Sequence, residues 1–181
     1  MRMYFKLIIF SVVFLSGCAS VRYAKKAATY EQAGMYDQAV EYFLQSLQRK
    51  RDNNDRATFG LMRASLHWKD DLAVRVDEAY ATYNDDAVVS LYQQLVRLQS
   101  SVAVFRVIVD IPQRTEIQYE EARKRYQFSN YQAAQDLLDR EQYTEATARL
   151  YRIMQLDPEY ERTRELYDFA RDRKSTRLNS S

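Results

Sequence analysis

Apolar residues recur every three or four positions along most of the chain, the spacing expected when one face of a helix is buried. One such series runs from Leu72 to Tyr83 and another from Val88 to Leu98. The polar residues 84–86 between them suit the start of a helix. The whole pattern predicts helices at 21–33, 36–50, 54–67, 70–82, 86–100, 114–140, 143–155 and 159–172.

One segment departs from this period. Residues 102–112, VAVFRVIVDIP, are rich in β-branched side chains and alternate in character. A short strand and the end of the preceding helix are both compatible with this pattern, but a lone strand among helices has no sheet partner. We therefore expect an extended apolar segment near 102–111 that packs across the helices. The side chains expected on its apolar side are Ala103, Phe105, Val107, Val109 and Ile111.

Glycine and proline are scarce, which strengthens the helical interpretation. After residue 17 only Gly34, Gly60, Pro112 and Pro158 remain, whereas Ala, Leu, Gln, Glu and Arg are plentiful. The composition predicts an all-α protein. Gly34 suits a tight turn between two helices because glycine tolerates the left-handed conformation. Gly60 suits a close helix crossing.

A segment near the start of the chain can be laid over one near its end, residues 27–53 over 134–159. Both segments predict a helix, a tight turn and a second helix. Small residues stand where the two helices of each hairpin would cross, and larger ones stand beside the crossings. The corresponding positions are Ala27 and Ala134, Tyr30 and Leu137, Tyr36 and Tyr143, Ala39 and Ala146, and Phe43 and Leu150.

This set of positions resembles the tetratricopeptide repeat, a helical hairpin of about 34 residues. The resemblance implies a solenoid of stacked hairpins whose groove binds a protein or peptide partner. Arg51 stands where a proline is common in the family, and Glu141 stands where a glycine is common. The repeat-like segments are 21–53, matching at Ala27, Tyr30, Gly34, Tyr36, Ala39, Phe43 and Leu47, and 130–160, matching at Ala134, Leu137, Tyr143, Ala146, Leu150 and Pro158.

Residues between the two copies leave room for two further degenerate repeats, because Ala39 and Ala146 are 107 positions apart. Pro158 suits the first position of a further helix, where its missing N–H would have no partner anyway. The alternative to a repeat array is two amphipathic helix pairs of an unrelated bundle.

The N-terminus has a different pattern. Arg2 and Lys6 precede an apolar run of nine residues, Leu7 to Leu15, which is too short to span a bilayer but fits a secretory signal peptide. The stretch Leu15-Ser16-Gly17-Cys18 resembles the lipobox of bacterial lipoproteins. That resemblance implies removal of residues 1–17 and acylation of Cys18, which would anchor the protein in a membrane. The alternative is an ordinary signal peptide in which the cysteine has no role.

Residues beside the lipobox bear on the location. Residue 19 is alanine rather than the aspartate that often retains such proteins in the inner membrane, and no acidic run follows Cys18. The resemblance therefore implies an outer-membrane lipoprotein that faces the periplasm. Residues 18–173 then form one helical repeat domain. The polar tail 174–181 resembles translated sequencing-adaptor sequence, an artefact; the alternative is a natural disordered tail.

Charge and candidate chemistry narrow the function. From Cys18 onward the chain has 25 basic and 25 acidic residues, and this balance argues against nucleic acid as a partner. His67 is the only histidine, and with Asp70 and Asp71 nearby it is predicted to end a helix just before the acidic start of the next one.

The sequence holds no catalytic motif, no phosphate-binding glycine loop and no metal-ligand spacing, so we expect no enzyme, no cofactor and no metal. It predicts a membrane-anchored protein-interaction scaffold in the bacterial cell envelope. An envelope enzyme or glycan-binding accessory protein is the alternative, and a structural lipoprotein lacking a specific partner is a third hypothesis.

Overall fold

The computed structural model describes residues 19–179, with side chains through Ser175, and this part of the chain is helical with no strand. The all-α prediction is therefore confirmed. The signal peptide predicted for residues 1–17 and the lipidation site predicted at Cys18 lie outside the described residues. A first helix covers residues 19–32, followed by α2 (Tyr36–Arg49), α3 (Asp55–Ala81), α4 (Asp85–Ala103), α5 (Gln113–Asp139), α6 (Tyr143–Leu156) and α7 (Thr163–Asn179).

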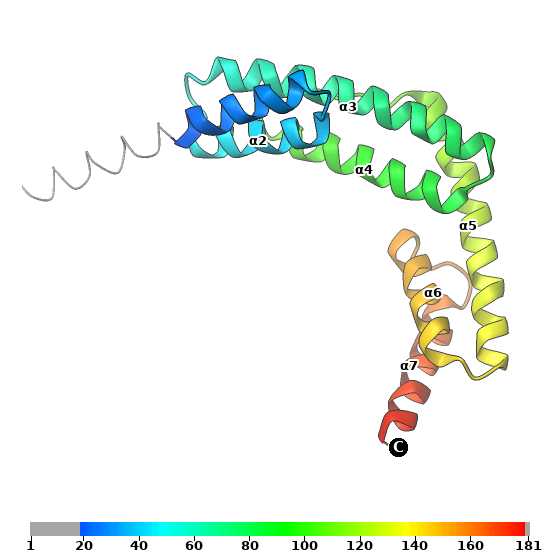
Figure 1. Ribbon diagram of the computed structural model, residues 1–181. Helices are drawn as coiled ribbons and strands as arrows, with labels where there is room; N and C mark the ends of the chain where they lie inside the picture. Colours follow the sequence, from blue (N-terminus) through cyan, green and yellow to red (C-terminus); the bar gives the residue numbers. More distant parts are fainter. Residues whose placement is uncertain (1–18, 180–181) are drawn as a thin grey trace, which may run out of the picture.

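From α2 to α7, each helix packs against the next one along the chain. The helices form two arms that meet at an angle (Figure 1). One arm contains the first helix, α2, α3 and α4, and the other contains α6, α7 and the C-terminal part of α5. Helix α5 belongs to both arms because it contacts α3, α4 and α6.

Both repeat-like segments form the expected helical hairpins. The Met35 N–H donates to the Tyr30 carbonyl at 2.9 Å, and the Gln142 N–H donates to the Leu137 carbonyl at 2.8 Å, so the two turns close in the same way. Gly34 has a φ of +73° and Glu141, at the matching position, a φ of +57°. The four alanines at the expected crossings, Ala27, Ala39, Ala134 and Ala146, are fully buried.

The expected break between residues 67 and 70 is absent, because α3 continues through it for 27 residues. No glycine or proline lies between Leu61 and Ala81, and half-buried Trp68 packs against the core on both sides of the expected break. The prediction that His67 ends a helix is therefore wrong. The prediction that Asp70 and Asp71 begin the next helix is also wrong. His67 lies within α3 and stacks on the ring of Tyr36, with centroids 4.8 Å apart.

A continuous α3 changes the organisation of the middle of the chain. Between the two repeat-like hairpins, α3 and α4 form one long hairpin instead of two short ones. Its turn repeats the geometry of the other two, since the Asn84 N–H donates to the Ala79 carbonyl at 2.9 Å and Tyr83 has a φ of +53°. Hairpin geometry thus recurs three times, with unequal helix lengths.

The extended apolar segment is present, although it is shorter than expected. Helix α4 continues through Ala103, which is exposed, and Phe105 lies in the turn 104–106, so the prediction that these two residues belong to the extended segment is wrong. Residues 107–112 form neither helix nor strand. Val107 and Val109 are buried in the first core, whereas Ile108 between them is 77% exposed. The Gln99 side-chain amide donates to the Val109 carbonyl at 2.8 Å, which fixes the segment against α4.

Two clusters of buried apolar residues lie in the arm of the first helix, α2, α3 and α4, which is the upper arm in Figure 1. The first lies among the first helix, α2, α3, the end of α4 and the extended segment, and the second lies among α3, α4 and α5. Gly60 confirms the predicted close crossing, because a Cβ atom at this position would overlap the buried ring of Phe43. The crossing of α2 and α3 therefore requires a glycine at residue 60 unless Phe43 moves.

The end of the chain differs from the prediction in two ways. Helix α7 begins at Thr163, so Pro158 lies exposed in the preceding turn and is not the first residue of a helix. The turn has its own hydrogen bonds, from the Tyr160 N–H to the Asp157 carbonyl and from the Thr163 N–H to the Tyr160 carbonyl. Helix α7 also continues to Asn179, beyond the expected end at residue 172 and into the polar tail.

Candidate functional site

A cleft of about 770 Å³ lies at the inner corner where the two arms meet, between α4, α5 and α6. Four tyrosines from these helices line it, together with charged and amide side chains. We name it the tyrosine cleft. Its principal side chains are Asp86, Tyr92, Gln93 and Arg97 of α4, Tyr119 and Tyr126 of α5, and Tyr151, Arg152 and Gln155 of α6.

Helical spacing explains why α4 presents these residues together. Asp86, Gln93 and Arg97 are separated by seven and four positions, so they share one face of the helix. The opposite face carries Val88 and Leu95, both fully buried in the second core. The face with Val88 and Leu95 thus attaches α4 to its neighbours, and the opposite face, which also carries Val89 and Val96, lines the cleft.

The rings of Tyr92 and Tyr119 join α4 to α5 within the cleft. They stack with centroids 3.8 Å apart and planes 7° from parallel. Burial raises the pKa of Tyr92, with a smaller contribution from the charge of Glu116. Burial also raises the pKa of Tyr119, and the positive charge of Arg123 partly opposes that shift. Both phenols are therefore neutral at physiological pH and can donate as well as accept hydrogen bonds.

Tyr126 lies deeper and is only 7% exposed. Burial raises its pKa, as does the negative charge of Asp86, while Arg152 and Arg149 act in the opposite direction. Arg97 and Asp86 form no ion pair within the part of the chain that the structure describes. The cleft therefore offers aromatic surface, phenolic hydroxyls and charges of both signs, with two arginines against one carboxylate.

A polar seam behind the cleft holds α5 against α3 and α4. The Arg125 guanidinium donates to both oxygens of Asp85, at 2.8 and 3.1 Å, and lies 5.3 Å from the centre of the Tyr80 ring. The Tyr80 hydroxyl donates to Glu121, and the Gln118 amide donates to Asp77 at 2.7 Å. These contacts position the α5 face that carries Tyr119 and Tyr126.

The predicted site residues occupy other places than the cleft. Eleven of the twelve repeat-packing residues lie in the helices or turns of the two hairpins, Pro158 lies in the turn before α7, and none lines the cleft. The tyrosines singled out from the sequence, Tyr30, Tyr36 and Tyr143, were repeat-packing positions, so Tyr92, Tyr119 and Tyr126 were missed. The available signal was the chain's fifteen tyrosines, since several fall beside, rather than on, the apolar stripe of their helix.

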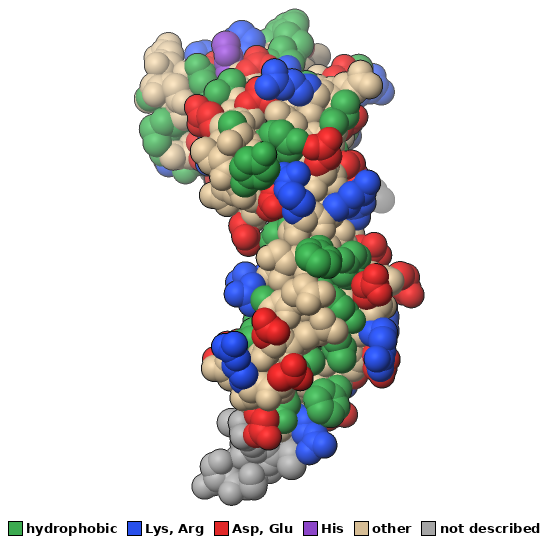
Figure 2. Space-filling view, turned by 90° about the vertical axis from the view of Figure 1, so that its right-hand side faces the viewer, with side chains coloured by type: hydrophobic (Ala, Val, Ile, Leu, Met, Phe, Trp, Pro, Cys, Tyr) green, Lys and Arg blue, Asp and Glu red, His purple; other side chains and the backbone are tan. Residues whose placement is uncertain are grey.

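The convex side of the molecule is different in character. Figure 2 shows the face that follows α5, where basic and acidic side chains are interspersed and hydrophobic side chains form small separate groups. Between residues 19 and 179, none of the helices combines the length and apolar composition needed to cross a membrane. In the same range no His, Cys, Asp and Glu side chains gather in a group suited to a metal ion.

Comparison with known proteins adds no family to this description. No family model matches the chain, and neither the curated proteins nor the solved structures include a match.

Proposed function

We propose that this chain is a lipid-anchored protein of the bacterial cell envelope that acts as a protein-interaction scaffold. The tyrosine cleft is the observation that carries the proposal. Tyrosine and arginine are enriched among the residues that contribute most to binding at protein interfaces. A tyrosine side chain also supplies a large contact area while losing little conformational freedom. The cleft combines four tyrosines and two arginines from three different helices.

The dimensions and charge of the cleft suggest the kind of partner. A volume of about 770 Å³ accommodates a few side chains of a peptide segment rather than a whole domain. Arg97 and Arg152 outnumber Asp86, so a segment with both acidic and apolar side chains suits the cleft. The resemblance to tetratricopeptide repeats supports the same role, since such hairpins bind peptides and helices in grooves.

The membrane anchor rests on the lipobox resemblance at Leu15-Ser16-Gly17-Cys18. Acylation at Cys18 would tether the helical domain by its N-terminal end, and Ala19 supports placement in the outer membrane facing the periplasm. We expect a labelled fatty acid to be incorporated into the wild-type protein and to be absent from Cys18→Ala. Incorporation into Cys18→Ala at the wild-type level would contradict the anchor.

Photo-crosslinking tests the scaffold role in cells. A photoreactive residue at Gln93 or Gln155 should crosslink to one protein of defined mass, because both positions line the cleft. The same residue at Phe128, which is 60% exposed on α5 and outside the cleft, serves as the matched control and should not give that product. When Tyr92→Ala is combined with the photoreactive residue at Gln93 or Gln155, the crosslinked product should disappear. Identical products from the cleft and from Phe128, or none from the cleft, would contradict the proposal.

The alternative of an envelope enzyme or glycan-binding accessory called for clustered carboxylates beside aromatic rings. Among the residues that line the cleft, Asp86 is the one carboxylate. Glycoside hydrolysis generally needs a pair of carboxyl groups flanking the bond that breaks. The residues of the cleft therefore favour the scaffold over a glycoside hydrolase.

A further inference from the structure

One end of the molecule concentrates positive charge. Three segments, residues 19–26, 49–56 and 104–108, hold eight basic residues and only two acidic ones, although the chain from Cys18 onward is balanced at 25 of each. We name these three segments the basic end. Its charged residues are Arg22, Lys25, Lys26, Arg49, Lys50, Arg51, Arg56 and Arg106, with Asp52 and Asp55.

Hydrogen bonds show that these segments meet. The Ser20 hydroxyl donates to the Ser46 carbonyl at 3.0 Å and the Ser46 hydroxyl donates to the Ser20 carbonyl at 2.9 Å, with both serines buried. The Asn54 amide donates to the Ser20 hydroxyl at 3.1 Å and to the Lys50 carbonyl at 2.8 Å. These hydrogen bonds join the first helix, the last turns of α2 and the residue before α3.

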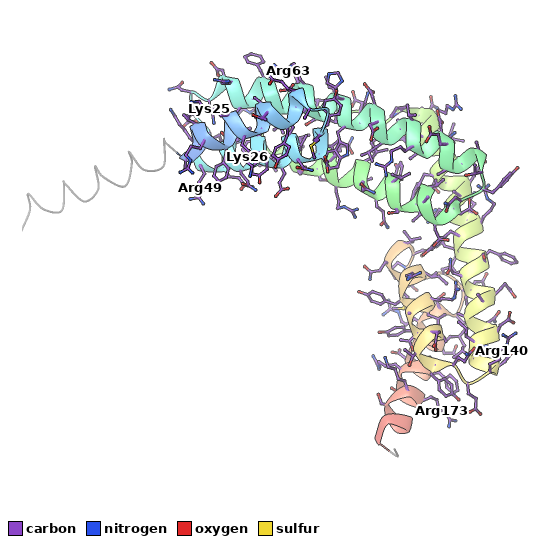
Figure 3. The ribbon with its side chains drawn as sticks, in the orientation of Figure 1. Lys25, Lys26, Arg49, Arg63, Arg140 and Arg173 are labelled. Carbon is purple, nitrogen blue, oxygen red and sulfur yellow. The ribbon has the colours of Figure 1, made fainter. Side chains whose placement is uncertain are left out.

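The third segment is attached through an arginine. The Arg51 guanidinium donates to the Val104 carbonyl at 2.7 Å and lies 5.6 Å from the centre of the Phe105 ring. The charges are therefore presented by a fixed surface built from the first helix, the end of α2, the start of α3 and the turn that follows α4. Figure 3 shows Lys25, Lys26 and Arg49 gathered at the outer end of the upper arm, far from Arg140 and Arg173 on the other arm.

Several of these cations have no acidic partner. Lys25, Arg49 and Lys50 are exposed, and within the described residues none of them forms an ion pair. Lys26 instead contacts an aromatic ring, lying 4.3 Å from the centre of Tyr42. Arg63, farther along α3, is by contrast paired with Glu31 at 2.9 Å. The basic end thus keeps its positive charge available to a ligand outside the chain.

Apolar and aromatic groups lie among the cations. Val21 is 53% exposed and Val104 is 60% exposed. The Tyr42 ring, beside Lys26, stacks with the rings of Tyr23 and Tyr30, whose centroids are 6.2 and 5.3 Å away respectively. Cations next to exposed aliphatic and tyrosine side chains match the layered chemistry of a lipid surface, which has anionic phosphates above an apolar interior. A nucleic acid would contact the cations but would leave the exposed valines without a complementary surface.

We propose that the basic end docks on a membrane surface that carries anionic phospholipids. The exposed Lys and Arg side chains contact headgroup phosphates, and Val21 and Val104 reach the interfacial region. The position of this surface in the chain supports the assignment, because its first segment, residues 19–26, directly follows the predicted lipid-bearing Cys18. An acyl group and a basic surface together make membrane attachment stable. The proposal is independent of the tyrosine cleft.

Vesicle flotation of the full chain carrying Cys18→Ser tests this contact without acylation. The probes are vesicles of phosphatidylcholine alone and vesicles with about a quarter phosphatidylglycerol, a typical anionic fraction. The protein should bind the anionic vesicles more strongly, and about 0.5 M salt should remove the difference by screening. Residues 1–17 carry Arg2 and Lys6 and also favour anionic vesicles, so the contribution of the basic end is isolated by comparing variants that all contain them.

Two matched triple variants locate the effect. Lys25→Glu with Arg49→Glu and Lys50→Glu should lower binding to anionic vesicles about tenfold or more. The control is Lys124→Glu with Arg140→Glu and Arg173→Glu, which makes the same change in net charge at exposed positions outside the basic end and should bind as well as the parent. Circular dichroism should show the same helix content in both.

Three results would overturn the proposal: equal binding to neutral and anionic vesicles, equal losses in the two triple variants, or transfer of the protein from anionic vesicles to an added DNA duplex. Each of them leaves the crosslinking result at the cleft unaffected, so the two proposals fail separately.

Discussion

At the scale of single residues, the same turn closes four helices of this protein with different side chains at its left-handed position. Gly34, Tyr83, Arg106 and Glu141 have φ values between +53° and +73°. In each turn the N–H of the following residue donates to a carbonyl five residues earlier. Glycine is preferred at such positions because a Cβ atom is strained there. Three of the four turns therefore hold strain that their sequence does not relieve.

Glu141→Gly should raise the free energy of unfolding by about 0.5–1 kcal/mol, because relief of strain exceeds the added freedom of the unfolded chain. Urea denaturation followed by circular dichroism measures the change. Arg140→Gly is the control, since Arg140 has a φ of −89° and gains no relief. It should lower the free energy of unfolding by about 0.5–1 kcal/mol. Equal effects of the two substitutions would contradict the assignment of strain to residue 141.

At the scale of elements, the two longest helices pack in different ways. Helix α3 buries aliphatic residues such as Leu61, Leu72 and Val76. Helix α5 has the same length of 27 residues but buries many polar side chains, including Gln118, Gln127 and Asn130. Sequence patterning predicted α5 to within one residue at each end, because helix formers fill it throughout. The same patterning predicted a break in α3, because the charged run Lys69–Asp71 interrupts its apolar series and resembles a boundary.

Proline substitution tests the continuity of α3. His67→Pro should lower the free energy of unfolding by about 3 kcal/mol or more, because it removes a hydrogen bond from a helix interior. Asp55→Pro, at the first position of the same helix, should be nearly neutral. Chemical denaturation of both variants measures the difference, and His67→Ala accounts for the loss of stacking on Tyr36. If proline is tolerated equally at residues 55 and 67, α3 is not continuous in solution.

At the scale of the whole molecule, the angle between the arms creates the cleft. Helix α5 packs on α3 and α4 through its first half and on α6 through its second. The Arg125–Asp85 pair lies near this junction and joins α5 to the start of α4, with the Asp85 side chain only 19% exposed. Tyr92, Tyr119 and Tyr151 come from three helices and line one surface only while the arms keep this arrangement.

A double-mutant cycle with Asp85→Asn and Arg125→Gln measures the contribution of this link. We expect a coupling free energy of about 1 kcal/mol, the upper end for exposed pairs, since the contact is bidentate and partly buried. Urea unfolding of the four proteins yields the coupling. Arg162 and Glu165, an exposed pair one turn apart around the start of α7, provide the comparison and should couple by about 0.5 kcal/mol or less. A coupling at Asp85–Arg125 no larger than this would show that the link does not stabilise the junction.

The sequence by itself determined the helical class, the two repeat-like hairpins with their turns at Gly34 and Glu141, and the extended segment before α5. These features depend on local preference and on the spacing of apolar residues over a few turns, which short stretches of sequence carry completely. The close crossing at Gly60 also followed from the sequence, because a glycine within a helix costs stability unless a neighbouring element needs the space that a side chain would fill.

Only the tertiary structure decided that α3 is continuous, that the arms meet at an angle, and that the tyrosine cleft and the basic end exist. Each of these features depends on contacts between residues far apart in the chain. Tyr92 meets Tyr119, Arg125 meets Asp85, and Arg51 meets Val104. The physical reason is that a polar or aromatic residue beside an apolar stripe has no fixed environment until its neighbouring helix is placed. The core follows from periodicity, whereas the tyrosine cleft and the basic end follow from packing.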